Sequence, residues 1–176
     1  QAQGLVVVDV ERRAADEVLA ALAQQLYRGH VVGFDPAATV VHESLERGEL
    51  GFGQGFDLYD DRIATRVSSD FAGIQRGGQE TLDAVLPWLE RNARGGKPFF
   101  FFLHLYEPHS PYDPPEPFRS RYTDPYDGEV AASDAIVGRF LEFLTARGLY
   151  DRALVVFLSD HGEGLGDHGE NEHGVF

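Results

Sequence analysis

The sequence contains no cysteine, so these 176 residues can supply neither a disulfide nor a cysteine nucleophile. Basic residues are also scarce. Lys and Arg number 15 against 29 Asp and Glu, which gives a formal net charge of −14. So negative a chain repels nucleic acid and anionic membranes, which argues against both as partners. No apolar run approaches the roughly 18 residues of a membrane-spanning helix.

The sequence does contain enough apolar material for a core, with 43% hydrophobic and 12% aromatic residues. Its length suits one globular domain. Methionine is absent, and the chain stops inside an apolar stretch at Val175-Phe176. We therefore expect a fragment of a larger protein, cut at both ends.

Hydrophobic periodicity predicts alternating strands and helices. Strands are expected at 5–10, 30–34, 98–105 and 153–158, and helices at 14–27, 79–94 and 126–147. Loops are expected in the glycine-rich segment 48–57 and the proline-rich segment 108–125. Pro87 should kink or split its helix, and Gly148 should end the helix at 126–147.

The last two strands and the helix between them form a strand–helix–strand unit. Such crossovers are right-handed, so we expect strands 98–105 and 153–158 to be adjacent and parallel, with helix 126–147 on one face. Parallel strands bring their carboxyl ends to one edge of the sheet, where ligands bind in open α/β sheets. His104 and His109 should then lie at the same edge as Asp160 and His161.

Asp160 and His161 follow directly after the apolar strand LVVFLS and precede a glycine-rich turn. Carboxylate and imidazole groups are good ligands for a divalent transition metal. We interpret the pair as half of a site for one divalent ion. Ca²⁺ prefers oxygen ligands, so His161 favours Mn²⁺ or Zn²⁺ without excluding Ca²⁺. A solvated Asp-His pair at a strand end is the alternative.

Two further histidines, His109 and His173, are predicted to bind an anionic group or to protonate a leaving oxygen, because histidine titrates nearest neutral pH. The alternative for each is a capping or solvated histidine. Other polar residues are assigned lesser roles. His104 is expected to be packed in the core, His168 to lie at the rim of the site, and His42 to lie on the surface. Glu163 and Glu170 are expected to support the metal ligands or to be solvated.

Three segments, FLHLYEPHSPYDPP, YDGEVAASDAIVGRFL and LVVFLSDHGEGLGDHGENEHG, resemble the sulfatase branch of the alkaline phosphatase superfamily. GFGQGFDLYDD resembles it as well, and the similarity extends back to about Leu26. The resemblance implies a large α/β domain with a mixed, mostly parallel sheet flanked by helices. Residues 1–176 would be part of that single catalytic domain, truncated at both ends. It also implies a small anionic sulfate or phosphate ester as substrate.

By this similarity, Asp160 and His161 match the family's paired metal ligands. Many members have Asn at the second position, and members with His include both sulfatases and phosphonate or phosphodiester hydrolases. His109, in Glu-Pro-His-Ser-Pro, matches the histidine that contacts the ester group. His173 matches a second substrate-binding or leaving-group histidine.

The family's nucleophile lies in the motif Cys/Ser-x-Pro-x-Arg, whose first residue becomes formylglycine, or is a threonine in relatives. No such motif occurs here, because the TDPYD segment at 123–127 has the proline and lacks the arginine. The acidic ligands of the family's first strand are also missing. We therefore expect the formylglycine outside this chain, and the chain alone to be inactive.

Three functions follow. The leading one is a metal-dependent sulfuric-ester hydrolase. The second, within the same superfamily, is a phosphodiesterase, phosphonate monoester hydrolase or phosphoethanolamine transferase. The third, of another class, is a non-catalytic metal-binding fragment or pseudoenzyme, which the missing nucleophile favours and the histidine cluster opposes.

Overall fold

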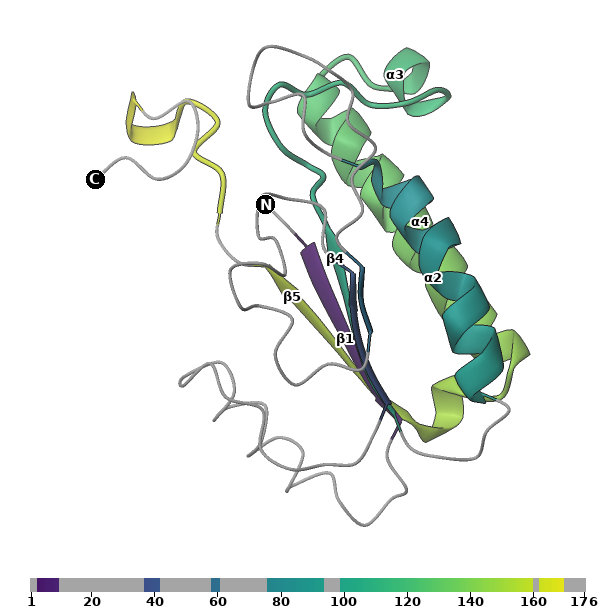
Figure 1. Ribbon diagram of the computed structural model, residues 1–176. Helices are drawn as coiled ribbons and strands as arrows, with labels where there is room; N and C mark the ends of the chain where they lie inside the picture. Colours follow the sequence, from purple (N-terminus) through teal and green to yellow (C-terminus); the bar gives the residue numbers. More distant parts are fainter. Residues whose placement is uncertain are drawn as a thin grey trace.

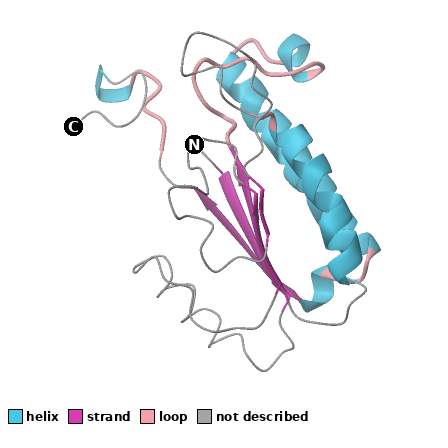
Figure 2. Cartoon of the chain, viewed as in Figure 1, coloured by secondary structure: helices cyan, strands magenta, loops and turns pink. Residues whose placement is uncertain are grey.

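The structure, a computed structural model, describes residues 3–9, 37–41, 58–60, 76–93, 99–159 and 162–169. Within these residues, the strands form a single sheet, and the long helices α2 and α4 lie side by side on one of its faces (Figures 1 and 2). The predicted helix 14–27, strand 30–34, loop 48–57 and residue His42 lie outside the described residues. No described helix is long and apolar enough to cross a membrane.

The sheet is mixed and has the strand order β3-β2-β4-β1-β5. Its strands are β1 (Gln3–Asp9), β2 (Ala37–Val41), β3 (Leu58–Asp60), β4 (Phe99–Leu105) and β5 (Ala153–Ser159). β2 is parallel to both β3 and β4, whereas β1 is antiparallel to β4 and to β5. Every described strand except β1 therefore runs in one direction, which gives the mostly parallel sheet that was predicted.

Strands β4 and β5 run in the same direction, as predicted, but they are not neighbours. β1 lies between them, so the predicted adjacency is wrong. An apolar strand in this position satisfies its backbone N–H and C=O groups along both edges. Gln3 of β1 pairs with Leu105 of β4 on one side and with Ser159 of β5 on the other. The carboxyl ends of β4 and β5 are therefore level, two strand spacings or about 10 Å apart.

The core lies between β4 and the two helices, α2 (Gly78–Ala93) and α4 (Pro125–Ala146). Alternate side chains of β4 are buried against the helices, as the period of two along a strand requires. Phe101 of β4 stacks on Phe140 of α4 and on Trp88 of α2, with ring centroids 5.5 and 6.2 Å apart. The remaining core residues of the helices are Leu82, Val85, Leu89, Ile136 and Leu144.

The described helices α2 and α4 agree with those predicted from the sequence, and the structure differs from the prediction at two points. α2 continues through Pro87 as one helix and is not split. The predicted loop at 108–125 contains the short helix α3 (Phe118–Arg121). The helical part of α4 ends before Gly148, as predicted. That glycine has a φ of +63°, which it adopts without the penalty a side chain would bring, and Leu149 N–H bonds back to the Leu144 carbonyl at 2.9 Å.

Candidate active site

The loop that follows β4 holds His109 through its ring. The His109 ring stacks on the Tyr106 ring, with centroids 4.1 Å apart and an interplanar angle of 25°. The Tyr106 hydroxyl lies 2.7 Å from His109 Nδ1, and the Ser110 carbonyl oxygen lies 2.6 Å from the same nitrogen. Both rings are half-buried. The orientation of the imidazole is therefore fixed by close neighbours in its own loop.

A carboxylate from α4 holds the backbone of the same loop. Glu129 accepts a hydrogen bond from His109 N–H on Oε2 at 2.9 Å and another from Asp113 N–H on Oε1 at 2.7 Å. Glu129 is only 5% exposed. A glutamate is rarely buried without partners, and these two N–H groups are its partners. Hydrogen bonds to an ionised acceptor are about twice as strong as neutral ones. One buried side chain therefore fixes both ends of the turn that carries His109.

Glu107 fastens the start of the loop to both helices. Its carboxylate oxygens accept from Gly78 N–H, at the first residue of α2, at 2.9 and 3.2 Å. A negative group at a helix N-terminus satisfies a donor that has no partner within the helix. The Glu107 carbonyl in turn accepts a hydrogen bond from the Ser133 hydroxyl of α4 at 3.2 Å. The loop is thus anchored on the packed helices.

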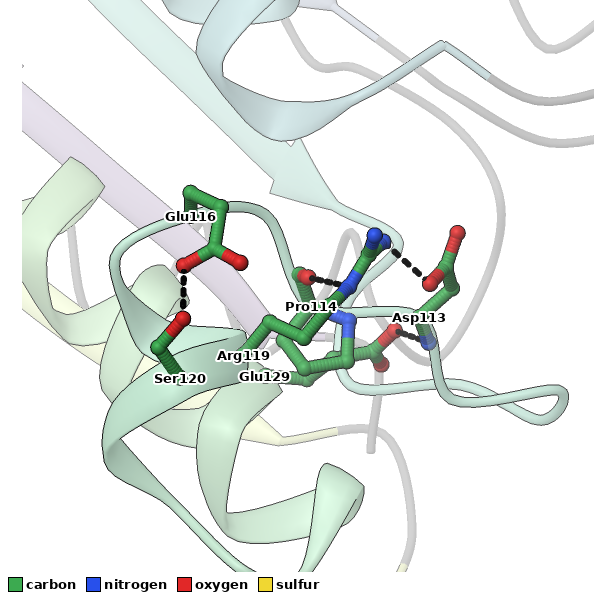
Figure 3. A network of polar contacts seen from close by, with 6 residues as sticks. All are labelled: Asp113, Pro114, Glu116, Arg119, Ser120 and Glu129. Carbon is green, nitrogen blue, oxygen red and sulfur yellow. Dashed lines mark hydrogen bonds and ion pairs between the residues drawn. The ribbon is translucent and has the colours of Figure 1, made fainter.

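The outer part of the loop is held by contacts closer to the surface (Figure 3). Arg119 of α3 forms an ion pair with Asp113 and donates to the Pro114 carbonyl at 3.1 Å. Ser120 donates to Glu116 at 2.6 Å. The Arg119–Asp113 pair is exposed, and exposed ion pairs contribute little to stability. The buried Glu129 contacts therefore matter more for holding His109.

Burial shapes the electrostatics of this loop. It raises the pKa of Tyr106 to about 12, with the negative charges of Glu129 and Glu107 adding to the shift. Burial also raises the pKa of Glu129 and of Glu107, although backbone N–H groups bonded to each carboxylate oppose the shift. Tyr106 therefore keeps its proton at neutral pH.

The segment after β5 approaches the same loop. Burial raises the pKa of Tyr112 to about 12, and the negative charge of Glu163 is the next contributor. Glu163 likewise adds to the raised pKa of Tyr126, whose ring meets that of Tyr112 edge-on at 5.4 Å. A charge acts on a neighbour in this way only at short range. Glu163, in the turn after β5, therefore lies within electrostatic range of Tyr112 and Tyr126.

Of the predicted site residues, His109 is described and Asp160, His161 and His173 lie outside the described residues, as does Glu170. The flanking residues Ser159 and Gly162 are described and lie at the end of β5 and just beyond it. His104, predicted to be a packed core residue, is half-buried in β4 and stacks on Phe102 with ring centroids 6.2 Å apart, but it is not one of the buried core residues. Within the described part of the chain, no three His, Asp or Glu side chains are grouped to hold a metal ion.

Glu129 and Tyr106 are the functional candidates that sequence reasoning missed. The sequence offers one partial signal for Glu129, because it lies three, four and seven residues before Ala132, Ser133 and Ile136, on one of the two faces of α4 that helical spacing allows to be buried. In the structure this face is the buried one. A glutamate on a buried helix face requires hydrogen-bonding partners, and the preceding loop supplies them.

The close approach of the loop to α4 leads to a stability prediction. A Cβ added to Gly128 would lie 2.8 Å from Pro114 Cγ, whereas one added to Gly138 of the same helix meets nothing within 4 Å. Gly128→Ala should lower the free energy of unfolding by about 1–3 kcal/mol through overpacking. Gly138→Ala should raise it by about 0.5–1 kcal/mol through better helix propensity. Denaturant unfolding measures both, and equal effects would contradict the described packing.

Comparison with known proteins identifies the family. The sulfatase family description matches residues 4–175, so the chain belongs to the sulfatase family. The α/β fold of the alkaline phosphatase superfamily, expected from the resemblance, is thereby confirmed.

Curated relatives include two sulfatases and one protein of the alkaline phosphatase superfamily. Steryl-sulfatase of Mus musculus is 35% identical, with the match covering 68% of this chain and 19% of that protein. An arylsulfatase of Clostridium perfringens is 26% identical over 45% of this chain and 25% of its own length. The multifunctional alkaline phosphatase superfamily protein PehA of Trinickia caryophylli is 27% identical, and the match covers 43% of this chain and 25% of that protein. The chain thus spans between 19% and 25% of these relatives. No solved structure gave a match.

Proposed function

We propose that residues 1–176 are part of a single sulfatase-type catalytic domain, and that the whole protein hydrolyses sulfate esters with the help of a divalent metal ion. One observation carries the proposal. The loop with His109 leaves the carboxyl end of β4, level with the end of β5 at Ser159, and the next residues along the chain are Asp160 and His161. Membership of the sulfatase family supports the same assignment.

Asp160 and His161 are the residues that would hold the metal ion. Their donor atoms fit it, because a carboxylate oxygen with an imidazole nitrogen suits Mn²⁺ or Zn²⁺ and is compatible with Ca²⁺. Two ligands do not complete a coordination sphere, so the remaining ligands would be water or groups from the rest of the protein. When bound, such an ion supplies Lewis-acid polarisation of the ester group.

His109 and His173 would act on the ester itself. A protonated imidazole attracts an anionic ester and donates a hydrogen bond to its oxygens. It can also give a proton to the departing alcohol, since histidine titrates near neutral pH. The nucleophile, a formylglycine, would come from outside this chain, because no Cys/Ser-x-Pro-x-Arg motif occurs in the sequence. The isolated chain is therefore expected to be inactive.

A phosphodiester or phosphonate monoester hydrolase, or a phosphoethanolamine transferase, is the second candidate. The similarity to a relative described as a multifunctional alkaline phosphatase superfamily protein favours it. Sulfate remains the preferred assignment, because the match to a steryl-sulfatase is both more identical and covers more of this chain.

The proposal is tested by assaying the full-length protein on three nitrophenyl substrates: a sulfate, a phosphate diester and a phosphonate monoester. We expect the highest kcat/KM on the sulfate, with mass spectrometry finding an aldehyde in place of a cysteine or serine side chain. Preference for a phosphorus ester would overturn the sulfatase assignment in favour of the second candidate. Metal binding without turnover of any substrate would point to a non-catalytic binding protein.

A further inference from the structure

The ring contacts of His109 determine which nitrogen meets a ligand. The Ser110 carbonyl oxygen, 2.6 Å from Nδ1, can only accept a hydrogen bond, so Nδ1 must carry the hydrogen. The Tyr106 hydroxyl oxygen, 2.7 Å from Nδ1, is able to accept as well. Nε2 then has the lone pair when the ring is neutral and a hydrogen when the ring is protonated. A ligand at His109 would therefore contact Nε2.

The backbone contacts determine where that nitrogen lies. Both oxygens of the Glu129 carboxylate are used, one by His109 N–H and the other by Asp113 N–H. Glu129 is itself held on α4, whose Ile136 and Phe140 are part of the core. The path from the core to the imidazole is thus short: one helix, one carboxylate and one turn of the loop.

We propose that Glu129 and Tyr106 are positioning residues for His109, with Glu129 fixing the backbone of its loop and Tyr106 the plane of its ring, so that Nε2 faces the ester. The inference rests on the proposed function in one respect, the contact between His109 and the ester. Neither residue contacts the substrate in this scheme. Both act through His109, and this separates a positioning role from a general contribution to folding.

The first test is a double-mutant cycle in the full-length protein, run on whichever ester it turns over. Glu129→Gln keeps the size of the side chain but replaces one acceptor oxygen with an NH₂ group, so one loop N–H loses its partner. A displacement of about 1 Å can reduce a rate on the order of 10²-fold, and we expect a loss of that size in kcat/KM. In a His109→Gln background, the same substitution should cost less than about twofold, since coupled residues are not additive.

The matched control is Glu142→Gln, the same change at an exposed position of the same helix, which should leave kcat/KM unaltered. Equal losses from Glu129→Gln in the two backgrounds would overturn the proposal. Tyr106→Phe covers the case in which Glu129→Gln does not fold, because it keeps the stacked ring and removes only the hydroxyl. It should lower kcat/KM about tenfold in the wild type and hardly at all beside His109→Gln, as expected for the loss of one hydrogen bond.

A second measurement does not depend on turnover. In ¹⁵N-histidine-labelled full-length protein, the signal lost on His109→Gln identifies His109, and its pattern reports the tautomer. We expect the Nδ1–H form in the wild type and a mixed population in Glu129→Gln, because the loosened loop no longer holds the Ser110 carbonyl beside Nδ1. An Nε2–H tautomer in the wild type would overturn the inference. If the protein turns over only phosphorus esters, the sulfatase proposal fails, while the cycle and the spectrum still decide this one.

Discussion

Replacing Asp160 with alanine in the full-length protein should remove the bound divalent ion and reduce ester hydrolysis to background. Asp160 follows Ser159, the last residue of β5, and its carboxylate is the anionic member of the proposed ligand pair. Lewis-acid stabilisation by a metal is worth several kcal/mol, which corresponds to a loss of about a thousandfold or more. Elemental analysis after desalting measures the metal, and initial rates measure turnover.

A control for this substitution lies in the same segment. Asp167 is exposed in the short helix η4 (Asp167–Gly169), so Asp167→Ala removes an equal charge without removing a proposed ligand. It should leave one ion bound per molecule. In the isolated 176-residue chain, we expect weak metal binding or none, because two ligands leave most of the coordination sphere to water. Full metal content in Asp160→Ala would remove Asp160 from the site.

The strands that carry the site could be predicted because each is a local pattern. β4 and β5 are continuous apolar runs, and the direction of β5 follows from the helical crossover that joins it to β4. The position of β1 between them could not be predicted in this way. A crossover fixes handedness and direction but permits an intervening strand. Which strand takes that place depends on pairing between residues about a hundred or more positions apart, such as Gln3 with Leu105 and with Ser159.

The burial of α4 shows a similar limit. The apolar residues Val130, Val137, Leu141 and Leu144 of α4 share one helical face in the sequence pattern, whereas the buried face runs through Ala132, Ile136, Phe140 and Leu144. Both sets have the spacings of three, four or seven residues that put side chains on one helical face, so periodicity alone does not choose between them. The choice is made by Phe101 of β4, which stacks on Phe140. That rotation also brings Glu129 inside.

The site shows why a chemically active residue is easier to predict than the residues that hold it in position. His109 is recognisable because histidine is chemically distinctive and follows a strand. Glu129 resembles any surface glutamate until the loop that precedes its helix is placed against it. Its partners are backbone N–H groups, and these carry no sequence signature. Buried polar residues on amphipathic helices are therefore the first places to search for such supports.

Replacing His109 or His173 with glutamine should slow hydrolysis of an alkyl ester far more than hydrolysis of a nitrophenyl ester. Help from a general acid is typically worth about 10²–10⁴-fold when the leaving group needs a proton. An alkoxide is a poor leaving group and depends on that proton, whereas a nitrophenolate leaves readily without it. The comparison of kcat/KM for the two substrates in each variant therefore isolates proton donation from binding.

The same measurement separates the two histidines from each other. A residue that only binds the ester should lose a similar factor on both substrates, because the charge it contacts is present in both. A residue that donates the proton should lose the full factor on the alkyl ester alone. The ring of His109 is held by Tyr106 and Ser110 through Nδ1, so its Nε2 can serve in either capacity, depending on which ester oxygen it meets. Small and equal effects of both substitutions on both substrates would make these histidines structural, and the proton would then have to come from another group in the protein.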